Sequence, residues 1–406
     1  MAGSFTIALE RNPSSVKLES GYNPTPLAYK VRGSGFGTKL AQSPAIVERF
    51  ASGTEGQLVY DYDNTWTKYG AQNVGGYITE LNARYTGGKS AANKFTRGQF
   101  STNHKSYAQT RAVYLSYWAR ITDWTAGDYG VIKLSRITSS VGAGGGGVYN
   151  GLGGTSLGGS NPNSGNGFSS TNDAAGVLSS TYAFPYPTSG WTRVEHQLYL
   201  SDLDTANGFF STRVGETAYE SLSGRISRTT ATQFLQDTLL LGLEQANPNQ
   251  FYEVTTLTPS ATYTVTVNGT PRSYVADASP DANEIITGLK AVLDAASISN
   301  TRVGNELAID PNASSVVFDS KFTIISRIPI VQNADIFLDT SLQRFVLTNN
   351  AVYSSATIVE PQAYTAWSDT EVDLTLFAPT ITGDRHLFFV TPNSTGGNVT
   401  TYFGTV

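Results

Sequence analysis

The chain has 406 residues, 15% of them charged, and a formal net charge of −5. This length allows about two to four domains with real cores, and the acidic balance argues against a nucleic-acid or anionic-membrane surface, which needs clustered Lys and Arg. The absence of cysteine excludes disulfide frameworks, zinc–thiolate sites and thiol catalysis, and it fits assembly in a reducing cytoplasm.

Glycine and aromatic residues are abundant, with 40 Gly, 22 Tyr and 19 Phe, which favours β-structure with long glycine-rich loops. The N-terminus shows no basic segment followed by an apolar run, so we expect no signal peptide. No stretch approaches about 20 continuous apolar residues, so we expect no membrane insertion.

Residues 1–45 alternate only weakly and contain Pro24, Pro26 and Pro44 among Gly and Ser. We predict an extended N-terminal arm here, suited to attachment. Strand-like segments begin at Ile46 and continue through the first half of the chain.

Two segments carry the most information, residues 113–121 and 191–200. Both alternate with period two, which predicts strands that bury one face in a core. Their second face is rich in aromatic, Arg, Glu and Gln side chains, a composition typical of a surface that binds sugars or another protein. The glycan-binding candidates on this face are Tyr114, Trp118, Arg120, Arg193, Glu195, Gln197 and Tyr199.

Residues 142–168 hold 12 glycines in 27 positions, a composition that cannot pack a core of its own. We predict a long loop. It is either a tolerated surface loop or a binding lid over the groove.

Residues 255–327 differ from the rest of the chain. Alternation over 263–267 leads into Asn-Gly at 268–269, the strongest short hairpin signal. The sequence Ser-Pro-Asp at 279–281 combines an N-cap, a first-turn proline and an acid, which predicts the start of a helix. The residues at helical spacing on one side of this helix are Ile285, Leu289, Val292 and Leu293.

Strand patterns return at 335–339 and 343–347, and residues 351–406 show short alternating runs separated by turn signals. Such spacing predicts a compact all-β module at the C-terminus.

Residues 46–254 together with 328–350 resemble the concanavalin A-like lectin/glucanase jelly roll. The resemblance implies a mainly β, two-layer sandwich that is interrupted by residues 255–327 and completed by a strand after the insert. The segments that carry it are 50–56 (Phe-Ala-Ser-Gly-Thr-Glu-Gly), 114–120, 130–133, 190–195, 207–208, 334–339 and 344–346.

The inserted α+β module, residues 255–327, resembles small domains of tailed-phage structural proteins through 263–269, 274–277 and the helix at 284–293. The tail, residues 351–406, is similar to immunoglobulin-type β modules. The resemblance of the inserted module implies a virion surface structural protein, either a capsid decoration or a tail fibre or baseplate component. It would assemble in the host cytoplasm as a homo-oligomer, with other virion proteins and host or environmental glycans as partners.

In the jelly-roll family the concave sheet face is the ligand groove, so the resemblance implies that the candidate residues face a glycan; a solvated face or a protein contact is the alternative. A glycosidase of this fold carries a Glu-x-Asp-x-Glu strand, and none occurs here. A lyase needs Arg, an amide and a Tyr or His base on one face, which Arg193, Gln197 and Tyr199 match only loosely. His196 belongs to the opposite face and is predicted to be a core histidine.

We therefore expect no catalytic residues and no enzymatic activity, with a polysaccharide lyase or glycoside hydrolase as the alternative. No cofactor is expected. The resemblance implies at most a structural calcium, either near Asp335 and Asp339 or near the first Gly-Thr stretch at 53–54, although calcium needs several oxygen ligands.

Overall fold

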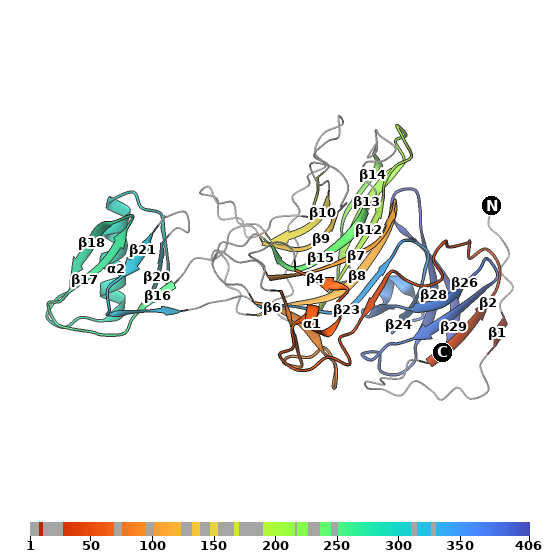
Figure 1. The fold of residues 1–406 in the computed structure, drawn as a ribbon, viewed down its shortest axis with the longest axis horizontal. Helices are drawn as coiled ribbons and strands as arrows, with labels where there is room; N and C mark the ends of the chain where they lie inside the picture. The colour runs from red at the N-terminus through yellow and green to blue at the C-terminus, as the bar shows by residue number, and fades with distance from the viewer. Residues whose placement is uncertain are drawn as a thin grey trace.

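The structure is a computed structural model. It describes residues 8–10, 27–68, 75–94, 101–122, 132–138, 147–152, 166–169, 190–215, 217–225, 236–244, 251–309, 315–325 and 330–406. Figure 1 shows a central sandwich, a C-terminal sandwich beside it, and a small α+β module that stands apart from both.

The central sandwich is a jelly roll of two sheets. Its larger sheet has eight strands. Strands from both halves of the chain meet in it, because the strand that follows the inserted module pairs with β8. The order is β14 (Thr217–Arg225), β13 (Gly208–Val214), β12 (Thr192–Tyr199), β8 (Ala112–Thr122), β23 (Ile330–Asp339), β6 (Ser90–Lys94) and β5 (Tyr77–Thr79), and β3 (Ile46–Glu48) also pairs with β23.

The second sheet has six strands, and the short helix α1 (Val59–Tyr62) lies near its edge. Its order is β11 (Asn166–Ser169), β10 (Gly147–Leu152), β9 (Ile132–Thr138), β15 (Gln236–Glu244), β7 (Ser101–Thr110) and β4 (Trp66–Thr67). The glycine-rich stretch predicted as one loop therefore contains two strands, β10 and β11, which pair with each other. Other residues of that stretch lie outside the described residues.

The core between the two sheets uses the apolar halves of the predicted alternations. Val113, Leu115 and Val194 are at most 1% exposed and belong to one cluster with Leu239 and Leu241 of β15. Burying large aliphatic side chains contributes about 1.5–3 kcal/mol each. The alternation thus sets which face of β8 and β12 is the core face.

The C-terminal module is a second sandwich, and it takes strands from outside the predicted range 351–406. In the predicted boundaries, 328–350 belongs to the jelly roll and 1–45 is an arm. The structure places β24 beside β28, and β2 beside β27. In its first sheet the order is β1 (Ala8–Glu10), β2 (Leu27–Arg32), β27 (Glu371–Leu376) and β26 (Ala363–Trp367). In its second sheet the order is β25 (Val359–Pro361), β24 (Arg344–Thr348), β28 (His386–Pro392) and β29 (Asn398–Thr405), and a 3-10 turn lies at Tyr353–Ser355.

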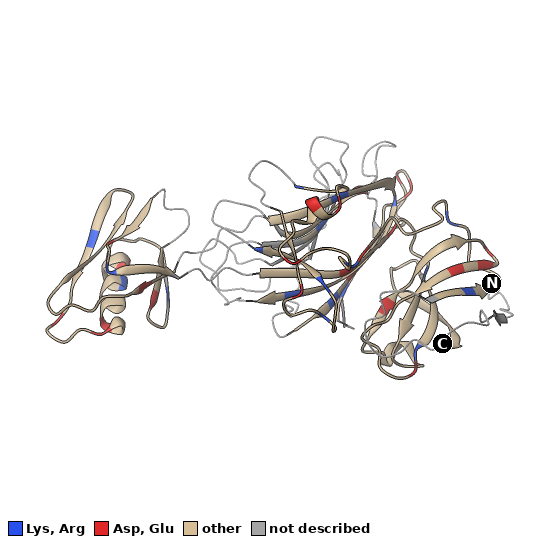
Figure 2. Ribbon diagram, turned by 60° about the horizontal axis from the view of Figure 1, so that its bottom comes forward, with Lys and Arg blue, Asp and Glu red and all other residues tan. Residues whose placement is uncertain are grey.

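Side-chain packing explains these two differences. Phe345 of β24 and Val31 of β2 are fully buried in the same C-terminal core. On the other side of β2, Lys30 pairs with Glu371 and with Asp373, so basic and acidic residues lie side by side on the outer surface (Figure 2).

The inserted module has two small sheets and the helix α2 (Ala282–Ala295). The predicted hairpin is confirmed, since Asn268 and Gly269 have φ of 50° and 78°, the positive values that a type I′ turn requires. The helix cap is Asp281 rather than Ser279, because the Asp281 carboxylate accepts the Glu284 N–H at 2.7 Å. One sheet contains β16 (Phe251–Val254), β19 (Asn300–Val303), β20 (Glu306–Ile309) and β22 (Phe322–Ile325). The other sheet contains β17 (Thr262–Val267), β18 (Thr270–Val275) and β21 (Val316–Phe318).

The inserted module begins before the predicted residue 255. Strand β16, which ends at residue 254, pairs with β20 and β22 of this module rather than with the jelly roll. The predicted fold class, a mainly β jelly-roll sandwich with an inserted α+β module and a C-terminal β module, is confirmed. None of the helices within the described ranges is long and apolar enough to cross a membrane.

Candidate functional site

Four of the seven predicted glycan-binding residues are buried between the two sandwiches. Tyr114, Arg193, Glu195 and Gln197 point away from the jelly-roll core, as the alternation predicts, but none is more than 1% exposed. The face that they share is covered by the C-terminal sandwich, so in the folded chain these side chains contact protein instead of solvent.

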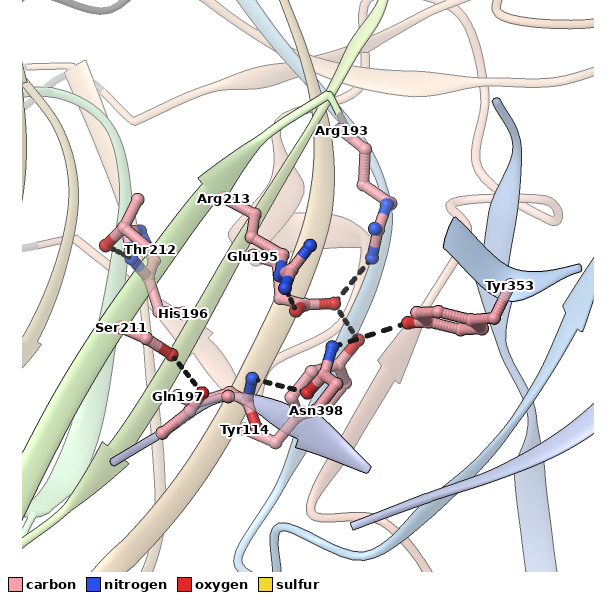
Figure 3. A network of polar contacts seen from close by, with 12 residues as sticks. Tyr114, Arg193, Glu195, His196, Gln197, Ser211, Thr212, Arg213, Tyr353 and Asn398 are labelled. Atoms are coloured by element: carbon pink, nitrogen blue, oxygen red, sulfur yellow. Dashed lines mark hydrogen bonds and ion pairs between the residues drawn. The ribbon is translucent and has the colours of Figure 1, made fainter. Parts of the chain in front are cut away.

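Glu195 is the centre of this buried contact (Figure 3). Its carboxylate accepts hydrogen bonds from Arg193 Nη1 at 2.6 Å and from the Tyr114 hydroxyl at 2.9 Å. Arg344, from β24 of the C-terminal sandwich, lies 3.6 Å from Glu195 Oε1, and Arg213 lies 3.8 Å away. Burial alone would raise the pKa of Glu195, but the guanidinium groups of Arg193, Arg344 and Arg213 lower it to about 2.

An amide bridge extends the same network to the last strand. Gln197 Nε2 donates to Asn398 Oδ1 at 2.9 Å, and Arg344 Nη2 donates to the same oxygen at 3.1 Å. The Arg344 guanidinium also lies 4.0 Å from the centre of the Tyr114 ring. Strands β12, β8, β24 and β29 are therefore joined through one set of polar side chains.

Trp118 lies in a second buried network. The Arg84 guanidinium sits 3.8 Å from the Trp118 ring and forms ion pairs with Asp335 and Glu360. Asp335 has φ of 46° at a register shift in β23, a conformation in which its carboxylate reaches Arg84 and the Tyr85 hydroxyl. Glu360 comes from β25, so this network also ties the C-terminal sandwich to the jelly roll.

The remaining candidates, Arg120 and Tyr199, are only half-buried. His196 is confirmed as a core histidine: it is 1% exposed, and its ring nitrogens lie 2.9 Å from Thr212 Oγ1 and 3.4 Å from Ser135 Oγ. Burial lowers the pKa of His196 to about 4, so it is neutral near pH 7.

Tyr199 lines a cleft of about 810 Å³ between the two sandwiches. Its ring stacks on Phe209, with centroids 5.8 Å apart. The turn that joins β28 to β29 packs against Phe209. At Gly396 of this turn the approach is so close that an added Cβ would lie only 2.9 Å from the Phe209 ring. The other lining residues are mostly hydroxyl, amide or small apolar groups, including Thr38, Gln109, Thr110, Asn207, Thr340, Ser341, Gln343, Asn393 and Ser394.

A buried ion pair forms the charged part of the cleft lining. Lys39 Nζ lies 2.6 Å from Asp339 Oδ2, and both side chains are at most 2% exposed. The Tyr364 hydroxyl donates to Asp339, and the Lys39 ammonium lies 3.8 Å from the Trp367 ring centre. Burial lowers the pKa of Lys39 to about 8, against the opposing attraction of Asp339.

The outer face of the six-stranded sheet offers a second group of polar residues. His104 of β7 is directly opposite Leu240 of β15, which is directly opposite Arg136 of β9. Leu239 and Leu241 face the core, so these three residues lie on the other face of the sheet, where Leu240 is only 2% exposed and His104 and Arg136 are half-buried. Burial lowers the pKa of His104, so its imidazole is neutral near pH 7.

The calcium ligands implied by resemblance do not fit the structure. Asp335 contacts Arg84 and Asp339 contacts Lys39, so each carboxylate is already neutralised by a cation. Among the described residues, no group of three or more His, Asp or Glu side chains is placed to hold a metal ion.

The sequence analysis names Tyr199, which lies in the cleft, but it does not predict that Lys39, Asp339 and Phe209 line the same cleft. Lys39 and Asp339 are 300 positions apart, and Lys39 falls in the segment predicted to be an extended arm. Phe209 directly follows Asn-Gly at 207–208, a pair that is typical of turns and indicates a loop at this place but not a binding cleft.

No known protein-family model matches the chain, and no curated protein is similar to it in sequence. Several solved structures are similar in shape. An endo-β-1,4-glucuronan lyase from the fungus Trichoderma reesei is 9% identical, with 73% of this chain and 97% of that chain covered and a TM-score of 0.36. Alginate lyase Aly36B is 8% identical, with the same coverage and a TM-score of 0.39. An alginate lyase from Aplysia kurodai is 10% identical over 65% of this chain and 86% of that chain, with a TM-score of 0.30.

These findings correct one expectation from the sequence. Since these similar structures are polysaccharide lyases, the expectation that the chain has no enzymatic activity is not retained. Identities of 8–10% and TM-scores below 0.4 do not by themselves assign an activity to this chain. The function has to be argued from its own side chains.

Proposed function

We propose that this protein binds polysaccharide chains in the cleft between its two sandwiches. The observation that carries the proposal is the stacked pair Tyr199 and Phe209 in a cleft of about 810 Å³ whose lining combines amides and hydroxyls with apolar side chains. Small-molecule sites have volumes of about 300–1,000 Å³ and combine aromatic surface with a few polar groups. Aromatic rings cover the C–H faces of sugars, while amides and hydroxyls hydrogen-bond to their oxygens.

The test is glycan binding by the whole chain and by Tyr199→Ala. We expect Tyr199→Ala to weaken binding about tenfold, because the loss of one aromatic contact is worth about 1–1.5 kcal/mol. Tyr402→Ala is the matched control, since Tyr402 is 42% exposed on β29 and does not line the cleft. The proposal fails if no glycan on a broad array binds, or if both variants bind as the parent does.

A second candidate function is cleavage of acidic polysaccharides by β-elimination at the outer face of the six-stranded sheet. The observation that favours it is a neutral imidazole, His104, two strands away from the cationic Arg136. At strand spacings of about 4.8 Å, the two Cα atoms lie about 10 Å apart. In such a reaction Arg136 holds the uronate carboxylate and His104 takes the proton from the adjacent carbon. The electron pair forms the C=C bond, and the glycosidic oxygen leaves with a proton from solvent.

This candidate is tested by incubating the protein with alginate and glucuronan and following the ultraviolet absorbance of the unsaturated product. We expect His104→Ala to abolish product formation and Tyr199→Ala to leave it in place, since Tyr199 is outside that face. Absence of product with both substrates, or turnover that survives His104→Ala, removes the candidate.

The virion setting stays a proposal that rests on the resemblance of residues 255–327 alone. Mass spectrometry of purified phage particles and of free protein from the same lysate would test it. The proposal predicts that the chain is enriched in the particles, in several copies beside other virion proteins, and it fails if the chain stays in the free fraction.

A further inference from the structure

The charges around the cleft cancel within the described residues. The charged side chains in its lining are Lys39 and Asp339, which pair with each other at 2.6 Å. At the edge of the cleft, the Arg111 guanidinium lies 5.7 Å from the Tyr199 ring centre and is paired with Asp202. Each of these cations, in the lining or at the edge of the cleft, therefore already has a carboxylate partner.

The buried pair stays neutral overall in either proton arrangement. Burial lowers the pKa of Lys39, and burial raises the pKa of Asp339. Whether the shared proton lies on the amine or on the carboxylate, the two groups sum to zero charge. Near neutral pH, the pair adds no net attraction for an anion.

The uncharged polar groups of the cleft offer both donors and acceptors, since Gln109 Nε2 donates to Asp237 Oδ2 at 3.4 Å and leaves its own amide oxygen as an acceptor. Gln343 Oε1 accepts from Ser341 Oγ at 2.5 Å, and Asn393 Oδ1 accepts the backbone N–H groups of Thr395 and Gly397. The amide nitrogens that remain on Gln343 and Asn393 suit hydroxyl, ring or acetamido oxygens of a sugar.

We propose that the cleft selects uncharged oligosaccharides and discriminates against uronates; this deepens, and rests on, the glycan-binding function proposed above. A uronate carboxylate loses hydration on entering the cleft, and burying a charge without a new partner is costly. A neutral sugar meets the stacked Tyr199 and Phe209 rings and the amide donors without that cost. The ligand class is therefore neutral, in contrast to an acidic polymer held by arginine.

The experiment compares neutral and acidic hexasaccharides by isothermal titration calorimetry with the full chain. The neutral probes are cellohexaose, laminarihexaose and N-acetylchitohexaose, and the acidic probes are alginate and glucuronan hexasaccharides. We expect at least one neutral probe to bind at least tenfold more tightly than either acidic probe, and Tyr199→Ala to weaken that binding. An acidic probe that binds as tightly as the best neutral one and is weakened by Tyr199→Ala overturns the inference but leaves glycan binding intact. Failure of all five probes to bind overturns the inference, and glycan binding itself fails only if no glycan on the array binds either.

A gain-of-charge variant provides the second arm. Ser394 is exposed in the cleft lining and bonds to no carboxylate among the described residues, so Ser394→Lys introduces a cation without an anionic partner. We expect it to raise the affinity for the acidic probes relative to the neutral probes about fivefold, equal to about 1 kcal/mol. Ser223→Lys, exposed on β14 and outside the cleft lining, is the matched control and should leave that ratio unchanged. An unchanged ratio in Ser394→Lys contradicts the assigned role of charge.

Discussion

Replacing Glu195 by glutamine should destabilise the contact between the two sandwiches. The side chain keeps its shape, but Arg193, Arg344 and Arg213 lose the carboxylate that they surround. A pKa held at about 2, against the ordinary value of 4.5, corresponds to about 3 kcal/mol of stabilisation near pH 7. Breaking a buried ion pair by removing one partner typically costs about 3–5 kcal/mol, which agrees.

The stabilisation that Glu195 contributes should decrease as the pH falls. Because folding lowers the pKa of Glu195, its contribution is fully present above about pH 4.5 and is lost as the pH falls toward 2. The difference between the parent and Glu195→Gln should therefore be about 3 kcal/mol at neutral pH and about 1 kcal/mol near pH 3.

Urea unfolding followed by tryptophan fluorescence measures this difference, because Trp118 lies at the interface and Trp367 lies in the C-terminal core. Asp202→Asn is the control of the same chemical type. Its pair with Arg111 is half-exposed, and such pairs are worth about 1 kcal/mol or less. A loss below about 0.5 kcal/mol for Glu195→Gln, or a loss that does not shrink in acid, would refute the assignment of this carboxylate as the centre of the interface.

Three further changes probe other parts of the molecule. His196→Gln should reduce the pH dependence of the unfolding free energy between about pH 6.5 and 4. In this range the unfolded histidine binds a proton and the buried one does not, so the parent loses stability as the pH falls. Urea titrations at several pH values measure the slope of the unfolding free energy against pH, and equal slopes for parent and variant would contradict the burial argument. Asp281→Ala removes the cap of α2 and should cost about 1 kcal/mol, seen as faster amide exchange confined to the inserted module, whereas Ser279→Ala should cost less. Gly396→Ala has to accommodate φ of 82° and a contact of 2.9 Å with Phe209, so glycan affinity and melting temperature should both fall; unchanged binding would separate that turn from the cleft.

Much of the fold follows from local signals. The alternation over 113–121 predicts which side chains of β8 enter the core, and Val113 and Leu115 are fully buried. The Asn-Gly pair at 268–269 predicts the hairpin of the inserted module because few other sequences adopt two consecutive positive φ angles. Each of these predictions depends only on neighbouring residues.

The candidate site depends on contacts that no local pattern specifies. Period-two alternation separates Tyr114 and Glu195 from the core but does not say whether solvent, sugar or protein covers their face. Aromatic, Arg and Glu side chains suit a glycan groove, and they equally suit a buried interface of satisfied ion pairs. The distinction lies in Arg344, which is 149 residues from Glu195 and comes from a strand with both faces buried.

That same burial of β24 explains the misplaced domain boundary. Arg344 to Thr348 are all buried, since Phe345 faces the C-terminal core while Arg344 faces the jelly roll. The sequence pattern of a strand buried on both faces does not show to which of two neighbouring sheets the strand belongs. Its pairing with β25 and β28 assigns it to the C-terminal sandwich.

The two interface networks have a consequence for the cleft. Its walls come from both sandwiches, with Tyr199 on β12, Tyr364 on β26 and Asn393 after β28, so its width depends on how firmly the sandwiches are held together. Glu195, among three arginines, and Arg84, between two carboxylates, hold them through buried ion pairs, which favour one geometry because a displacement would leave a buried charge without its partner. A site whose walls are held in one arrangement loses less conformational entropy when it binds a ligand. The residues that resemble a sugar groove would thus serve sugar binding indirectly, by fixing the distance between the walls that contact it.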